Sequence, residues 1–372
     1  MTRGIHRGVW ATPPSVNNGP FAPGLLHGPE RDLEIAYVGN SVTAQKGGFQ
    51  SYLHEQITQR GWCRDSAMKV ALGAIGSIGI ASYWEILLRD RRPDVVFLEC
   101  STADIGYATP IADIEIALRH LVAAMRKLGS QICFLHMPRS DRHATRRRDV
   151  LRIYDRVARD FGVPSIDLEF HDALEDAEQY LYDGVHTTPL GASVIAEAII
   201  DALGKQITET PTIRVAQPDS SSYGPDLLIR GWQGMEYEPA PSTGTFRFGI
   251  PFAETNIGGT ATWTSSSHQL LGLQILLGAH SGVIEITDDH NSLTIQTWDR
   301  TCIRNPRLSY LPIPPLFRRS NRITFRAVSE DRGHRDLFGG SSHDLHRGLT
   351  FRILGYMETC ASQQSKSGAR HE

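Results

Sequence analysis

Short apolar runs alternate with longer segments of helical periodicity from Leu33 to about Lys205, and this alternation constrains the fold more than any other feature. It is typical of β-α-β units, because neighbouring parallel strands are joined by a crossover long enough to hold a helix. The segment 111–128, for example, has apolar residues at helical spacing and ends at Gly129, a residue type that commonly terminates helices. Strands are expected at 33–38, 68–72, 94–99, 131–136 and 163–168. The pattern predicts a three-layer α/β domain with a parallel five-stranded sheet.

The sequence changes character after Lys205. Thr, Ser, Gly and Pro become frequent, helical periodicity disappears, and short β-rich runs recur between turn residues. Several runs alternate polar and apolar residues, as half-buried antiparallel strands do. They lie at 245–250, 260–264, 282–286, 293–298, 322–326 and 349–353. We therefore expect an all-β sandwich domain in this part of the chain.

The length of 372 residues exceeds the usual size of one domain, which agrees with a division into two. A proline-rich stretch precedes the α/β part, and a segment rich in proline and serine follows it. The expected organisation is an N-terminal extension (1–31), an α/β domain (32–206), a linker (207–223), an accessory β-sandwich (224–358) and a disordered tail (359–372).

Charge and cysteine content exclude several classes of function. The 38 basic and 41 acidic residues give a net charge of −3, without the excess of Lys and Arg that indicates a nucleic-acid partner. The five cysteines are scattered and form no C-x-x-C pair, which predicts reduced thiols and no zinc site. The sequence has neither the apolar run of a signal peptide nor a segment long enough to span a membrane. We expect a cytoplasmic protein with no membrane partner, and the sequence leaves its oligomeric state open.

The first candidate for chemistry is Ser41, which follows the first expected strand in the turn Gly39-Asn40-Ser41-Val42-Thr43 and precedes a helix expected over 48–60. Ligands bind at the carboxyl ends of the strands in open α/β sheets, and free N–H groups at a helix N-terminus stabilise developing negative charge. The position therefore suits a nucleophile. Serine is also a preferred helix cap, so the turn alone leaves a structural role open.

The second candidate is the pair Asp183 and His186, which lies just before a helix expected from about Pro189. An Asp three residues ahead of a His can accept a hydrogen bond from Nδ1–H of the imidazole and leave Nε2 free to act as a general base. The alternative is structural, because Asp-Gly is a common turn and His186 could cap the helix.

Together the two patterns resemble the SGNH hydrolases, also called the GDSL esterase/lipase family, whose catalytic domain is flavodoxin-like. Gly39-Asn40-Ser41-Val42-Thr43 is similar to the first motif of that family, with Asn40 where Asp is more usual. Asp183-Gly184-Val185-His186 matches the last motif, including the downstream Gly191. The resemblance implies that the serine attacks an ester carbonyl, the histidine takes and returns the proton, and the aspartate orients the imidazole.

The resemblance also implies donors for the oxyanion. Leu72-Gly73-Ala74-Ile75-Gly76-Ser77 is similar to the glycine motif of the family, which makes the backbone N–H of Gly76 the expected donor and Gly73 the alternative. A glycine-rich turn with no catalytic role is the other interpretation. With Ser41, which the family also uses, Gly76 belongs to the expected oxyanion hole.

The third motif departs from the family. Its Gly-x-Asn-Asp is replaced by Ser101-Thr102-Ala103-Asp104, so Ala103 stands where an asparagine side chain usually donates to the oxyanion. The hydroxyl of Ser101 or of Thr102 is the candidate replacement, and Ser101 completes the expected oxyanion hole. Loss of such a donor typically costs about a hundred- to thousandfold in turnover. Asp104 is expected to tether loops rather than to titrate during the reaction.

Candidate substrate-binding residues are Asn40, Thr102, Asp104 and Arg139. Arg139 opens a basic run after the fourth strand, which could hold an anionic sugar or form a solvated helix face; its other members are Arg142, His143, Arg146, Arg147 and Arg148. In the β-rich part, aromatic residues fit a sandwich core or a surface that stacks on sugar rings; these are Trp232, Trp263, Trp298 and Phe325.

Three functions fit these observations. The leading hypothesis is a serine esterase that removes small acyl groups, acetyl above all, from a carbohydrate or glycoconjugate. The second is an acyltransferase that uses the same triad to acylate a sugar or natural-product hydroxyl. The third is a carbohydrate-binding or structural protein without catalysis, for which Ala103 would be a first sign of lost activity. No metal or organic cofactor is expected, because the mechanism needs none and no ligand-spaced cluster occurs.

Overall fold

The chain forms two compact units, residues 1–224 and 225–372. A computed structural model describes residues 9–19, 33–63, 67–73, 75–88, 91–107, 109–140, 144–170, 177–209, 227–278, 281–297, 306–328 and 350–360. Among these, no helix is both long and apolar enough to cross a membrane. The linker expected over 207–223 lies outside the described residues beyond the end of α8 at Glu209, and so does the expected tail beyond Cys360.

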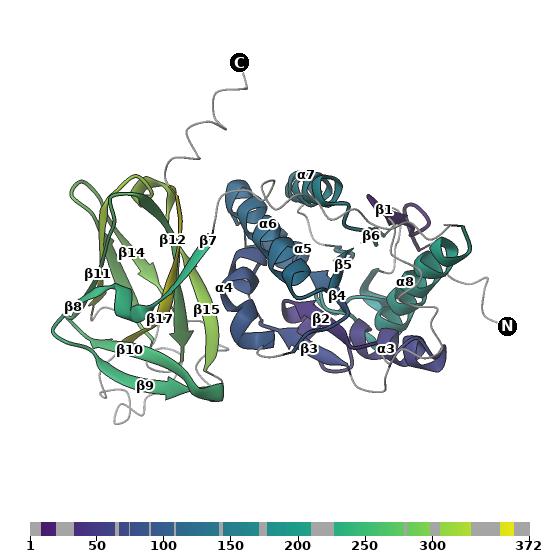
Figure 1. Ribbon diagram of the computed structural model, residues 1–372, viewed down its shortest axis with the longest axis horizontal. Coiled ribbons are helices and arrows are strands. Elements are labelled where there is room, and N and C mark those ends of the chain that lie inside the picture. The colour runs from purple at the N-terminus through teal and green to yellow at the C-terminus, as the bar shows by residue number, and fades with distance from the viewer. Residues whose placement is uncertain are drawn as a thin grey trace, which may run out of the picture. The chain divides into compact units, whose positions relative to one another are not determined.

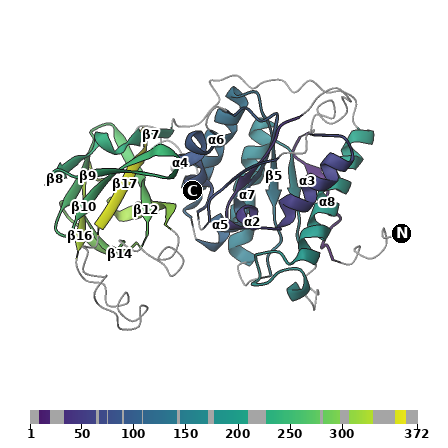
Figure 2. The same cartoon turned by 90° about the horizontal axis from the view of Figure 1, so that it is seen from below.

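The first unit is a three-layer α/β domain around a six-stranded sheet with the order β1-β6-β5-β4-β2-β3 (Figures 1 and 2). Five strands are parallel, which confirms the predicted sheet; they are β2 (Ile35–Gly39), β3 (Met68–Ala71), β4 (Val95–Glu99), β5 (Gln131–His136) and β6 (Ser165–Asp167). Every residue of β2 and β4 is buried. Burial on both faces explains why the strands appear in the sequence as unbroken apolar runs.

Helices cover both faces of this sheet. α3 (Phe49–Gln59) and α8 (Pro189–Glu209) pack against each other, and their apolar residues share one core cluster with Tyr37 and Phe97 of the sheet. α4 (Ser77–Leu88), α6 (Ile111–Lys127) and α7 (Ala144–Phe161) form the other layer. Short helices α2 (Ser41–Ala44) and α5 (Ser101–Gly106) begin directly after β2 and β4, and η1 (Ala177–Gln179) is a 3₁₀ turn. The carboxyl ends of β2 and β4 therefore lead into short helices, which carry Ser41 and the candidate residues 101–104.

The described part of the N-terminal segment packs on the α/β domain. β1 (Val16–Asn17) adds an antiparallel strand to the free edge of β6, and Trp10 forms an isolated bridge with Phe170. Val9 and Trp10 are buried in the core cluster of this domain. The sequence pattern gave no strand here, because two residues are too few to show a period.

The second unit consists of two antiparallel sheets that share a core, as predicted for a β-sandwich. One has the order β15-β12-β17-β10-β9, with β7 paired to β17, and the other has the order β14-β13-β16-β11-β8. The first comprises β7 (Leu227–Gly231), β9 (Ser242–Phe246), β10 (Ile250–Asn256), β12 (His268–Leu277), β15 (Arg307–Pro312) and β17 (Thr350–Cys360). The second comprises β8 (Glu236–Glu238), β11 (Thr260–Thr264), β13 (Val283–Thr287), β14 (Ser292–Gln296) and β16 (Arg322–Val328).

One expected strand needs correction, and the two interpretations of the aromatic residues can be separated for three of them. The segment 245–250 is not one strand, because β9 ends at Phe246 and a 3₁₀ turn containing Gly249, with φ of +73°, turns the chain into β10. Trp263 and Phe325 are fully buried between the sheets, so they are core residues and cannot stack on a sugar. Trp232 is partly buried against the same core, and Trp298 lies outside the described residues.

Candidate active site

Ser41 is the first residue of α2 and is half-buried at the end of β2. The helix cap is the preceding residue, Asn40, whose side-chain Oδ1 accepts a hydrogen bond from Val42 N at 3.0 Å. The capping role that the sequence left open for Ser41 therefore belongs to Asn40. Gly39 is required by close packing, since a Cβ there would lie 2.3 Å from the carbonyl oxygen of Glu99.

The turn that holds Ser41 rests on a buried carboxylate, that of Glu99. Asn40 Nδ2 donates to Glu99 Oε1 at 3.2 Å, and Thr43 Oγ1 donates to Oε2 at 3.1 Å. Burial raises the pKa of Glu99 to about 7, although hydrogen bonds from Thr102, Thr43 and Asn40 oppose this rise. The arrangement explains why an amide replaces the usual aspartate at position 40, because a second carboxylate would accept where a donor is needed. Asn40 is 1% exposed with both amide atoms engaged, so it shapes the turn that holds Ser41 instead of contacting substrate.

Asp183 and His186 form the hydrogen-bonded pair that their spacing predicts. Asp183 Oδ2 lies 2.8 Å from His186 Nδ1, and Oδ1 accepts from the backbone N–H groups of Val185 and His186 at 3.1 and 2.8 Å. Gly184 allows the tight turn with φ of +79°. Partial burial alone would raise the pKa of Asp183, but the hydrogen bonds from His186 and Val185 outweigh it and hold this pKa below its ordinary value. The carboxylate therefore stays ionised and fixes the tautomer that leaves Nε2 free.

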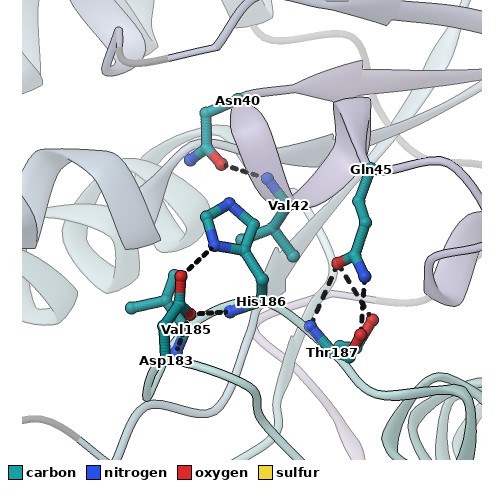
Figure 3. Close-up of polar contacts among 7 residues, drawn as sticks. All are labelled: Asn40, Val42, Gln45, Asp183, Val185, His186 and Thr187. Atoms are coloured by element: carbon teal, nitrogen blue, oxygen red, sulfur yellow. Dashed lines mark hydrogen bonds and ion pairs between the residues drawn. The ribbon is translucent and has the colours of Figure 1, made fainter. Parts of the chain in front are cut away.

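His186 does not cap α8. The hydroxyl of Thr188 accepts a hydrogen bond from Gly191 N at 3.0 Å and serves that helix entrance instead. Gly191 is needed because a Cβ would lie 2.0 Å from the carbonyl oxygen of Tyr180. In Figure 3 the imidazole extends from the Asp183 carboxylate toward the turn that holds Asn40 and Val42.

Gln45 joins this loop to the turn that holds Ser41, a contact that the sequence did not indicate. Its Oε1 accepts from Thr187 N at 3.0 Å and from Thr187 Oγ1 at 3.2 Å, and its Nε2 donates to Thr187 O at 2.6 Å (Figure 3). Gln45 caps the C-terminal end of α2, one turn after Ser41, and Thr187 follows His186. Segments 142 residues apart are thus held side by side.

The expected oxyanion residue Gly76 lies against another buried carboxylate. Asp104 Oδ1 accepts from Ser77 N at 2.9 Å, and Oδ2 accepts from Tyr154 OH at 2.7 Å. A Cβ on Gly76 would lie 2.0 Å from Asp104 Oδ1, whereas one on Gly73 would meet nothing within 4 Å. Burial raises the pKa of Asp104 to about 6, against hydrogen bonds from Tyr154, Ser77 and Thr109. Asp104 is completely buried, so it tethers the glycine turn and does not touch substrate.

The third motif does not provide a hydroxyl donor of the expected kind. Ser101 is 1% exposed, and its Oγ lies 3.3 Å from Nδ1 of the buried His136. Thr102 is 3% exposed, and its carbonyl accepts from the Arg139 guanidinium. The expected oxyanion role of the Ser101 hydroxyl and the substrate-binding role of Thr102 are therefore not supported, because both side chains lie in the interior.

The basic run is mostly engaged in structural contacts. Arg146 donates to the carbonyls of Asp104 and Thr109, and Arg147 is paired with Asp167 and Glu169. Arg139 is half-buried on Thr102 O, while the next residue, Ser140, donates its N–H to Gly184 O at 3.0 Å in the loop of Asp183 and His186. Arg142 and His143 lie outside the described residues. Of the run, Arg139 is the member that the described contacts place beside the candidate site.

Fold and site together define a three-layer α/β domain in which the turn of Ser41 is tied to the loop of Asp183 and His186. Residues 37–194 match the model of the GDSL-like Lipase/Acylhydrolase family, and this part of the chain is a domain of that family. No curated protein gives a significant match to the chain. Within the described residues, no cluster of His, Cys, Asp and Glu is arranged to hold a metal ion.

Among solved structures, the chain is similar to a two-domain esterase (CEX) active on acetylated mannans, with 14% identity and a TM-score of 0.64. The match covers 88% of this chain and 91% of that one. The same esterase co-crystallised with mannopentaose matches with 15% identity, a TM-score of 0.61 and the same coverage of 88% and 91%. At this identity the likeness concerns the fold, which is an SGNH-like α/β domain followed by antiparallel sheets.

Proposed function

We propose that the protein is a serine esterase in which Ser41, His186 and Asp183 form the catalytic triad. The observation that carries the proposal is the 2.8 Å contact between Asp183 Oδ2 and His186 Nδ1, on a loop that Gln45 joins to the turn of Ser41. An aspartate–imidazole pair held beside a serine at a strand end is the arrangement that acyl transfer requires.

The reaction follows from these positions. His186 Nε2 accepts the proton as Ser41 Oγ attacks the ester carbonyl, and the backbone N–H groups of Ser41 and Gly76 stabilise the oxyanion. His186 then protonates the leaving alcohol, and Ser41 keeps the acyl group. Water, deprotonated by His186, attacks the acyl-enzyme and releases the acid. Asp183 remains ionised throughout and stabilises the imidazolium.

For the substrate we propose O-acetyl esters of a polysaccharide or oligosaccharide. The support is the fold shared along nearly the whole chain with an esterase active on acetylated mannans, including the antiparallel unit. Because a fold does not fix a substrate, acetylated mannan is the first ligand to test and acetylated xylan the second.

The test measures acetate release from acetylated mannan and turnover of p-nitrophenyl acetate by wild type, Ser41→Ala and His186→Ala. Ser51→Ala, which changes an exposed serine of α3, is the matched control. We expect both site variants to lose at least about a thousandfold in kcat and the control to lose nothing. Fluorophosphonate labelling should occur in wild type and Ser51→Ala but not in Ser41→Ala. Wild-type turnover by Ser41→Ala would refute the proposal, and formation of a new ester with added sugar acceptors would instead indicate an acyltransferase.

A further inference from the structure

We propose that Gln45 is a positioning residue that sets the distance between Ser41 and His186. The inference rests on the proposed triad, and it concerns a residue outside that triad and outside the motifs that resemble the family. No local geometry relates the serine turn to the histidine loop, since they come from opposite ends of the domain sequence. A catalytic base must lie within hydrogen-bond reach of its nucleophile, so a direct tie between the two segments has chemical consequences.

The side-chain amide of Gln45 forms hydrogen bonds with Thr187 through both its oxygen and its nitrogen. Its oxygen accepts from both the backbone N–H and the hydroxyl of Thr187, and its nitrogen donates to the carbonyl of the same residue. Thr187 is 1% exposed and Gln45 is half-buried, so water competes little for these bonds. Hydrogen bonds to the N–H and the C=O of Thr187 restrain the peptide planes on both sides of this residue, and the preceding residue is His186.

The backbone of Gln45 is fixed independently of its side chain. Its carbonyl accepts from Gln50 Nε2 of α3 at 2.8 Å and from Lys69 Nζ of β3 at 3.2 Å. α2 places Ser41 only one helical turn before this anchored residue. The connection from Ser41 through α2, Gln45 and Thr187 to His186 is therefore short, and each link is hydrogen-bonded or covalent.

The histidine end is restrained in the same way. Tyr182 N donates to His186 O at 2.8 Å, and Leu181 and Thr187 form an isolated bridge. The loop is therefore one closed unit around the Asp183–His186 pair, and Gln45 determines where this unit lies relative to Ser41. If the whole loop moved, the Asp183–His186 bond would stay intact, but His186 Nε2 would move away from Ser41 Oγ.

The experiment compares Gln45→Met, which keeps the length of the side chain, with Gln59→Met, which changes an exposed glutamine of α3. We expect kcat for p-nitrophenyl acetate to fall about 10- to 100-fold in Gln45→Met, because small displacements of reacting groups cost that much. KM should stay close to wild type, while the melting temperature should fall, because the backbone N–H and carbonyl of Thr187 lose a partner in the interior. Gln59→Met should match wild type in all three.

Two further measurements separate positioning from a general structural effect. Thr187→Val removes only the hydroxyl donor and should lower kcat less, and the double variant should be no slower than Gln45→Met, since the hydroxyl has then already lost its acceptor. Hydrogen exchange at the Thr187 amide should be faster in Gln45→Met by at least about tenfold if the Gln45 oxygen protects it.

A wild-type kcat in Gln45→Met with unchanged exchange at Thr187 would overturn the proposal, as would strictly additive effects in the double variant. If Gln45→Met does not fold, Gln45→Glu decides, because it keeps the acceptor and sets a carboxylate oxygen against Thr187 O. A wild-type kcat and wild-type exchange in that variant would also overturn it. If Ser41→Ala retains full turnover, the proposed function fails, and the tie to Thr187 is judged by exchange alone.

Discussion

Asn40, the residue before the proposed nucleophile Ser41, donates a hydrogen bond through Nδ2 to Oε1 of the buried Glu99 at 3.2 Å. The contact links the end of β2 to the end of β4, and Thr43 adds a second donor to the same carboxylate. The residue type at position 40 and the ionisation of Glu99 therefore affect each other. Substitution of either residue measures this coupling.

Asn40→Asp should destabilise the protein by about 1–3 kcal/mol at pH 8, because it replaces the donor by a second carboxylate in the interior. At pH 5 the loss should be smaller, since the two carboxyl groups can then share a proton. Urea denaturation at both pH values measures the difference. Asn17→Asp adds the same charge at an exposed position and should change little at either pH.

Glu99 should make the protein less stable as the pH rises. Burial places the pKa of Glu99 in the folded protein at about 7, above the ordinary value of 4.5. Its contribution to the free energy of unfolding is therefore fully present below pH 4.5 and is lost as the pH rises through 7. Because a tenfold change in an ionisation equilibrium corresponds to about 1.4 kcal/mol, the loss amounts to at most about 3–4 kcal/mol. Glu99→Gln should remove this part of the pH dependence of the unfolding free energy. The remaining slope belongs partly to Asp104, whose pKa is also raised. An unchanged slope in Glu99→Gln, equal to that of the exposed control Glu55→Gln, would contradict the assignment.

Asp183→Asn should lower kcat by about a thousandfold or more, because an amide can donate to Nδ1 and stabilise the wrong tautomer of His186. The fold should be affected little, since the Asp183 side chain is 58% exposed. Turnover of p-nitrophenyl acetate at saturation measures kcat, and the melting temperature measures the effect on the fold. Asp201→Asn, at an exposed position of α8, should leave both unchanged. A fall in melting temperature as large as that of a core variant would indicate a structural role instead.

The sequence predicts those features whose residues lie close together along the chain, and it misses those that join distant segments. The parallel sheet follows from apolar runs, and the Asp183–His186 bond follows from a spacing of three residues. The tie between Gln45 and Thr187 has no such signature, because its two ends are 142 residues apart. The hydroxyl of Ser101 was misassigned for a related reason, since its partner His136 belongs to a neighbouring strand and its direction is set by packing. Composition likewise could not separate the buried Trp263 from an aromatic surface.

The two glycines of the turn after β3 give a matched test of whether the position of the Gly76 N–H matters for the reaction, with Gly73 as the control. A methyl group on Gly76 would lie 2.0 Å from Asp104 Oδ1 and displace the carboxylate that holds Ser77 N, whereas a methyl group on Gly73 has open space. Gly76→Ala should therefore lower kcat about a hundredfold, the typical effect of losing an oxyanion donor, while Gly73→Ala stays within about threefold of wild type.

Steady-state kinetics on both variants measure this difference, with circular dichroism to check that each one folds. Displacing Asp104 should also affect its bond to Tyr154, so Gly76→Ala should lower the melting temperature as well. Asp104→Asn separates the two effects, because the amide oxygen can still accept from Ser77 N while the new methyl group is absent. If Asp104→Asn keeps most of its activity and Gly76→Ala does not, the position of the Gly76 N–H, and not the charge behind it, determines the rate. The reverse order would show that the Asp104 carboxyl, and not the position of the Gly76 N–H, determines the rate.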